Sequence, residues 1–145
     1  MKITVETTVS APIEEVWRAW NNPDAIKQWN TASDDWHTTQ AAVDLRVGGS
    51  FSSRMEAKDG NVGFDFAGTY TKIIKHELIE SSFGDRVLLV EFLNGQDGVT
   101  VRETFDAETT HTVEQQRGGW GSNIEQLQEI RSVSSKSLIK HVYNS

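Results

Sequence analysis

The sequence predicts an α+β domain in which a seven-stranded, curved antiparallel sheet wraps around one long helix near the end of the chain. Residues 2–9 and 36–106 alternate apolar and polar side chains with a period of two, as half-buried strands do. Helical patterns are confined to residues 12–29 and 112–131. Because the strands and helices are segregated, an antiparallel sheet is expected. With a single long helix to cover it, this sheet must curl.

The first strand, residues 2–9, is followed by two short helices. Pro12 suits the first turn of a helix, where its missing N–H is not needed. Pro23 ends that helix and starts another brief one, which closes near Trp29. The chain then returns to strand periodicity.

Six hairpin-linked strands are predicted between Trp36 and about Asp106. Glycine-containing turns separate them, and residues 58–61 (KDGN) give a strong hairpin signal. The segment 87–93 is apolar on both faces, which suggests contact with a second subunit, although an exposed leucine or two is ordinary on a monomer. A homodimer is therefore a hypothesis.

The last helix is predicted from Thr112 to about Arg131. Its apolar positions recur at three and four residues and form one stripe: Val113, Trp120, Ile124, Leu127 and Ile130. Thr112 and Gln115 have the spacing of a capping box. Three interior glycines, Gly118, Gly119 and Gly121, each cost about 1 kcal/mol relative to alanine. They predict that the helix backbone approaches a neighbour closely, and that a cavity is left where the helix surface is thin.

Length, charge and cysteine content exclude several classes of protein. A chain of 145 residues suits one domain. No apolar run reaches the roughly 20 residues of a membrane span, and no signal peptide is recognised. Zero cysteines agree with a cytoplasmic location. A net charge of −7 opposes binding to nucleic acid. The histidines lack metal-ligand spacing, so neither a metal nor a cofactor is predicted.

Three motifs carry a family resemblance: residues 10–20 (SAPIEEVWRAW), 47–51 (VGGSF) and 116–120 (QRGGW). In this order they resemble the START-like helix-grip superfamily (SRPBCC), and within it the activator of heat-shock-protein-ninety ATPase homologue-like branch. The likeness covers residues 1–131. The tail, residues 132–145, does not look like the family's usual helix ending, and it is either mobile or paired elsewhere.

The resemblance implies a helix-grip fold but no single activity. The superfamily includes binders of lipids, hormones and polyketides, some cyclases and hydratases, and chaperone co-factors, and it has no shared catalytic motif. The first hypothesis is binding of a small hydrophobic or amphipathic molecule between the sheet and the last helix. Side chains predicted to face that space are Phe51, Ser53, Met55, Phe66, Tyr70, Val101, Glu103, Trp120 and Ile124.

Two residues are candidates for proton transfer. Glu103 lies on the apolar face of the last strand, where burial would raise the pKa of its carboxyl. The alternative is a carboxylate that is hydrogen-bonded inside the core or lies at the mouth of the cavity. His37 shares the inward phase of its strand unless a bulge intervenes, in which case it lies on the surface. An enzyme of the cyclase or hydratase kind using this pair is the second hypothesis. A chaperone-associated interaction domain with a chaperone partner is the third.

The tryptophans have two interpretations. They form either an aromatic wall for a flat ligand or ordinary core packing, to which Trp17 and Trp120 are assigned.

Overall fold

The computed structural model describes residues 1–30, 36–60 and 62–128. The elements follow the predicted order: β1 (Lys2–Val9), α1 (Ile13–Asn21), α2 (Pro23–Trp29), β2 (Trp36–Val43), β3 (Ser50–Ala57), β4 (Gly63–Ile74), β5 (Leu78–Phe83), β6 (Arg86–Gly95), β7 (Gly98–Asp106) and α3 (Val113–Glu125). The tail from residue 132 and the predicted end of the last helix lie outside the described residues, so those predictions stay open.

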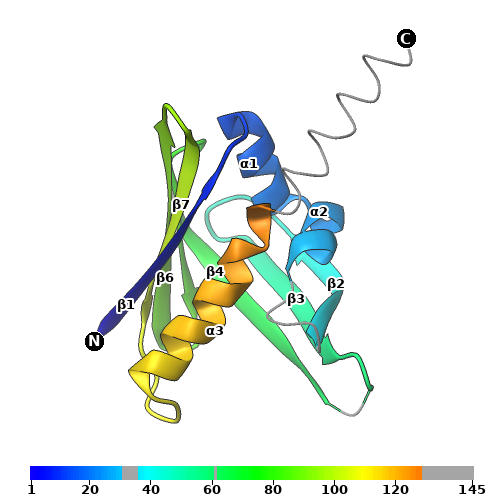
Figure 1. The fold of residues 1–145 in the computed structure, drawn as a ribbon. Coiled ribbons are helices and arrows are strands. Elements are labelled where there is room, and N and C mark those ends of the chain that lie inside the picture. Colours follow the sequence, from blue (N-terminus) through cyan, green and yellow to red (C-terminus); the bar gives the residue numbers. More distant parts are fainter. Residues whose placement is uncertain (31–35, 61, 129–145) are drawn as a thin grey trace.

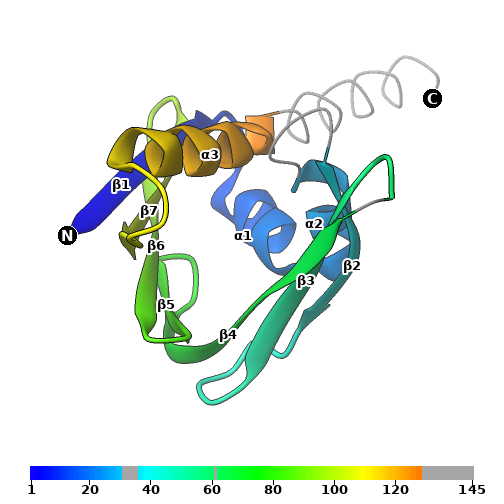
Figure 2. The same ribbon diagram turned by 90° about the horizontal axis from the view of Figure 1, so that it is seen from below.

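The seven strands form one antiparallel sheet in the order β1-β7-β6-β5-β4-β3-β2. The sheet bends into a trough, with all three helices on its concave side (Figures 1 and 2). Helix α3 packs beside β1 at one edge, and α2 packs on β2 at the other edge. This confirms the predicted α+β class and the curled sheet. The helices pack on the two edges of the sheet, so unfilled space remains over the middle of the trough.

The core follows from the alternation along β7. Its inward side chains Val99, Val101 and Phe105 are fully buried, and Glu103 is 3% exposed. Each pairs with an apolar inward residue of β1 or β6, such as Ile3 beside Phe105. The period-two pattern therefore places one carboxyl among the apolar side chains of the core.

Helix α3 begins with the predicted capping box. The Thr112 hydroxyl accepts from the Gln115 N–H at 3.1 Å, and the Gln115 side-chain oxygen accepts from the Thr112 N–H at 3.0 Å. Ile124 and Leu127 of the predicted stripe are buried, and Trp120 is half-buried. The start of the helix and its buried face are thus as the sequence predicted.

Replacing the cap residue tests how much the box contributes. Thr112→Ala is expected to lower the free energy of unfolding by about 1 kcal/mol, because one donor of the first turn loses its acceptor. Thr112→Ser keeps the hydroxyl and is the matched control. Urea denaturation measures both variants, and equal stabilities of the alanine and serine forms would contradict the prediction.

The glycines of α3 do not bring its backbone against a neighbour, so that prediction was wrong. A methyl group on Gly118 or Gly119 would meet no atom of the described residues within 4 Å, and one on Gly121 would only touch Val5 at 3.8 Å. The glycines instead leave open space, and at Gly119 this space belongs to the cavity described below.

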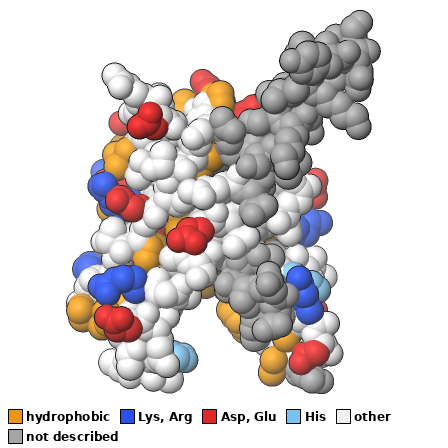
Figure 3. All heavy atoms as spheres, in the orientation of Figure 1, with side chains coloured by type: hydrophobic (Ala, Val, Ile, Leu, Met, Phe, Trp, Pro, Cys, Tyr) orange, Lys and Arg blue, Asp and Glu red, His pale blue; other side chains and the backbone are white. Residues whose placement is uncertain are grey.

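The outer surface is mixed in charge and partly apolar. On the face in Figure 3, acidic and basic side chains are interspersed. On the outer face of β6, Val87 and Leu93 are exposed and Leu89 is half-buried. The homodimer suggested by this strand stays a prediction. Within the described ranges, no helix has the length and apolar character needed to cross a membrane.

Candidate functional site

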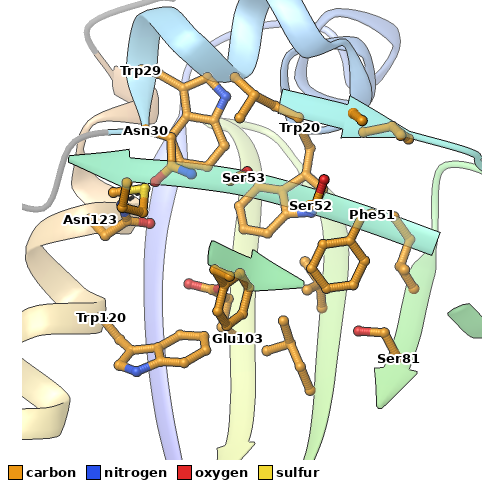
Figure 4. Close-up of a pocket in the computed structure, with 18 of the residues that line it drawn as sticks. Trp20, Trp29, Asn30, Phe51, Ser52, Ser53, Ser81, Glu103, Trp120 and Asn123 are labelled. Carbon is orange, nitrogen blue, oxygen red and sulfur yellow. Dashed lines mark hydrogen bonds between the residues drawn. The ribbon is translucent and has the colours of Figure 1, made fainter. Parts of the chain in front are cut away.

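A cavity of about 340 Å³ lies between the concave face of the sheet and helices α2 and α3. Strands β2 to β7 line it on one side, through residues such as Phe51, Ser53 and Ile79. On the other side lie the end of α1, α2 and one face of α3 (Figure 4). Phe64 lines it too and is 51% exposed, so the cavity opens toward the β3–β4 hairpin. The trough is therefore incompletely filled.

Aromatic rings form two sides of the cavity. Trp20 and Trp29 stack at 5.1 Å between ring centroids, with their planes 29° apart. Across the cavity in Figure 4, Trp120 stacks on Phe105 at 3.9 Å and meets the ring of Phe66 edge-on at 5.8 Å. Such rings present flat apolar faces with negative electrostatic potential. Trp29 has its polar end satisfied, because its indole N–H donates to the Ala19 carbonyl at 2.7 Å.

Glu103 is the buried ionisable group of this cavity. It stands on β7 between Val5 of β1 and Val90 of β6, with its side chain directed to the cavity (Figure 4). Its Oε1 is buried and has no hydrogen-bond partner among the described residues. Burial away from water raises the pKa of Glu103 to about 8, so the carboxyl is mostly protonated at pH 7. A polar group of a ligand would find an unused partner there.

The remaining polar groups of the cavity are uncharged at neutral pH. Burial, and secondarily the negative charge of Asp44, raise the pKa of Tyr70 to about 12, so its phenol stays protonated. Ser53 and Ser81 bring buried hydroxyls from β3 and β5. Asn123 of α3 donates to the side-chain oxygen of Asn30, which joins α3 to the end of α2.

Most of the predicted ligand contacts line the cavity. The residues that line the cavity are Phe51, Ser53, Met55, Phe66, Tyr70, Glu103 and Trp120. Val101 and Ile124 are not among the lining residues and instead pack inside the core. Val101 has the same phase as Glu103, but it pairs with Phe92, whose ring packs on Trp17 at 5.0 Å. Helix α1 therefore fills the end of the trough that lies beside Val101.

His37 does not join Glu103 in the cavity. A register shift between Thr38 and Gln40 changes the phase of β2. Thr38 is therefore the inward residue, and its hydroxyl donates to the Asn30 carbonyl at 2.6 Å. His37 is paired with Glu56 on the outer face of the sheet. The inward phase predicted for His37 was wrong, and the bulge is the reason.

Some lining residues were not among the predicted contacts. Ile79, Ser81, Leu88 and Val90 follow the inward phases of β5 and β6, so the same alternation rule would have found them. Asn30 and Asn123 had no sequence signal. Of the tryptophans considered as an aromatic wall, Trp20, Trp29 and Trp120 line the cavity, Trp17 is buried in the core, and the side chain of Trp36 lies outside the described part.

Comparison with known proteins identifies the family. The family model described as "Activator of Hsp90 ATPase homolog 1-like protein" matches residues 10–131. The chain belongs to this family. The match confirms the resemblance that the three sequence motifs indicated, and proteins with the fold of this family commonly bind ligands. No protein of curated function matches the chain.

Several solved structures are similar to this member of the Activator of Hsp90 ATPase homolog 1-like family. The solution structure of an AHSA1-like protein from Aeromonas hydrophila is 44% identical, with a TM-score of 0.86, and the match covers 93% of this chain and 94% of that one. A solution structure from Cytophaga hutchinsonii is 39% identical, with a TM-score of 0.75 and coverages of 97% and 95%. A crystal structure from Nitrosomonas europaea, 20% identical with a TM-score of 0.79 and coverages of 94% and 97%, shows the shared fold alone.

Proposed function

We propose that this protein binds a small apolar or amphipathic molecule in the cavity between the sheet and α3. The observation that carries the proposal is the Glu103 carboxyl, which belongs to the lining of an aromatic-lined cavity and whose buried Oε1 has no hydrogen-bond partner among the described residues. Buried polar atoms are nearly always hydrogen-bonded, and an unsatisfied one costs about 1–3 kcal/mol. A ligand that brings a polar group to this oxygen would remove that cost.

The size and lining of the cavity support the same proposal. A volume of about 340 Å³ is at the lower end of the range for small-molecule sites, which is roughly 300–1,000 Å³. Apolar surface that a ligand buries against the aromatic rings of the cavity contributes about 25 cal/mol per Å² to the free energy of binding. The few polar groups then fix the ligand's orientation rather than supply most of its affinity.

Binding is better supported than the two alternatives. A cyclase or hydratase needs a second proton-exchanging group beside Glu103, and the structure places His37 on the outer face of the sheet. Tyr70, with a pKa of about 12, is a poor base near neutral pH. A chaperone-associated role is suggested by the family's name, and no feature within the described residues favours it over binding.

Two neighbouring glycines of α3 provide a matched test. Gly119 lines the cavity whereas Gly118 does not, and a Cβ atom added to either would have no atom of the described part of the chain within 4 Å. Gly119→Leu is expected to weaken binding of the neutral fluorescent probe N-phenyl-1-naphthylamine about tenfold, equivalent to about 1.4 kcal/mol, by occupying part of the cavity. Gly118→Leu has the same gain in helix propensity and should leave the probe's Kd unchanged.

Fluorescence titration of the wild type and both variants gives the three dissociation constants. Equal affinities for the two variants would contradict the location of the site. A wild-type protein that binds neither this probe nor any of a panel of lipids and aromatic compounds would remove the proposal.

A further inference from the structure

The ionisable groups of the cavity are all acids. Among the described residues that line it, the titratable ones are Glu103 and Tyr70, and none is Lys, Arg or His. A carboxylate or phosphate ligand would therefore be buried without a positively charged partner, which is strongly unfavourable. The lining thus selects against anions.

The aromatic rings of the cavity favour the opposite charge. Trp20, Trp29 and Trp120 contribute indole rings to the lining, and Phe51 and Phe66 add two phenyl rings. Trp20 and Trp29 stack on each other and Trp120 stacks on Phe105, so another ring covers one face of each indole. The negative potential over such faces attracts an ammonium group, most strongly over tryptophan. Cavities that combine several aromatic faces with an acidic group are suited to organic cations.

We propose that the ligand is an amphipathic amine, whose apolar body lies between the aromatic walls and whose ammonium group pairs with Glu103. This inference rests on the proposed binding function and specifies its ligand class. The ammonium would donate to the Glu103 carboxylate, a group of the cavity lining whose Oε1 has no hydrogen-bond partner in the described structure.

Pairing requires Glu103 to release a proton, and no other charged side chain among the described lining residues opposes this. Its cross-strand neighbours are Val5 of β1 and Val90 of β6, and the cavity lining adds the uncharged side chains of Trp120 and Tyr70. The cost of ionisation is therefore that of burial alone. With a pKa of about 8, ionising Glu103 at pH 7 reduces affinity only about tenfold. For the amine to bind tightly, its direct contact with the carboxylate must exceed this penalty and the cost of desolvating the ammonium itself.

Proton release gives the proposal a distinctive signature. At pH 7 about nine in ten molecules carry the proton on Glu103. When a protonated amine binds, the carboxyl O–H bond breaks, the electron pair stays on the carboxylate, and the proton passes to the buffer. Amine binding should thus release close to one proton, whereas a neutral alcohol should release none.

Three matched probes test the inference by isothermal titration calorimetry at pH 7: 1-naphthylmethylamine, 1-naphthylmethanol and 1-naphthoate. We expect the amine to bind about tenfold more tightly than the alcohol, and the carboxylate most weakly. Repeating the titrations in buffers with different ionisation enthalpies counts the protons released.

Glu103→Gln is the specific variant, because it keeps the shape of the side chain but cannot ionise. In this variant the amine should lose both its advantage over the alcohol and its proton release. If the wild type bound the alcohol as tightly as the amine, or bound the amine without releasing a proton, the amine inference would be wrong and the cavity would remain a binding site. If none of the three probes bound, the inference and the proposed function would both be contradicted.

Discussion

Glu103→Gln is expected to raise the free energy of unfolding by roughly 3 kcal/mol at pH 7. In the folded protein burial raises the pKa of this carboxyl from its ordinary value of 4.5 to about 8. In the unfolded chain the carboxyl is exposed to water and ionises at its ordinary pKa. At pH 7 the unfolded state is therefore favoured by ionisation, while the folded state keeps the proton. Glutamine does not ionise in either state, so the penalty disappears.

The pH dependence follows from the direction of this shift. Below pH 4.5 the carboxyl is protonated in both states and has no effect on stability. Between pH 4.5 and about 8 the unfolded state binds fewer protons than the folded state, so wild-type stability falls by up to about 1.4 kcal/mol per pH unit. Above the folded-state pKa the loss is constant. A raised carboxyl pKa thus destabilises the protein at high pH, contrary to the effect of a salt-bridged carboxylate.

Urea denaturation of both proteins at pH 5, 7 and 8.5 measures the difference. The stability difference should grow from about 1 kcal/mol or less at pH 5 to roughly 4.5 kcal/mol at pH 8.5. All other titrating groups are the same in the wild type and the variant, so their contributions to the stability difference cancel. A gap that stayed constant over this range would mean that Glu103 titrates normally in the folded state.

The unusual position of Glu103 was predictable from the sequence because β7 is regular. Its register with β1 and β6 is uninterrupted, so counting by two from Val99 places residue 103 on the inner face. The same rule failed on β2, where the irregularity at Thr38 moved His37 to the other face. A bulge adds a residue to one strand without a clear sequence signal, and every phase beyond it is inverted.

The cavity itself was harder to predict than its walls. Phase tells which face of the sheet a side chain occupies, but not whether a helix covers it. Val101 and Glu103 have the same phase, yet α1 packs near the first and the cavity opens beside the second. The glycines of α3 were also ambiguous, since a missing side chain is compatible with close contact and with empty space. The coordinates show empty space at Gly118 and Gly119.

Gly98→Ala is expected to destabilise the protein by on the order of 3 kcal/mol, because two independent effects add. Gly98 has a φ of +128°, which L-residues with a side chain rarely adopt. A methyl group there would also lie 2.2 Å from the Val9 carbonyl oxygen and 2.7 Å from the Ser10 Cα, both backbone atoms of the chain leaving β1. Neither can move without disturbing the β1–β7 pairing, which ends at Val9 and Val99.

Gly95→Ala is the matched control in the same hairpin. Gly95 is the cross-strand partner of Gly98, but a methyl group on it would meet only the Gly98 carbonyl oxygen, at an ordinary 3.6 Å. Its stability should remain within about 0.5 kcal/mol of the wild type. Denaturation of the two variants separates a general intolerance of the hairpin to side chains from the two features that are specific to Gly98. A loss confined to Gly98→Ala would show that its positive φ and its close approach to the chain leaving β1 require glycine at this position. Equal losses would contradict this prediction.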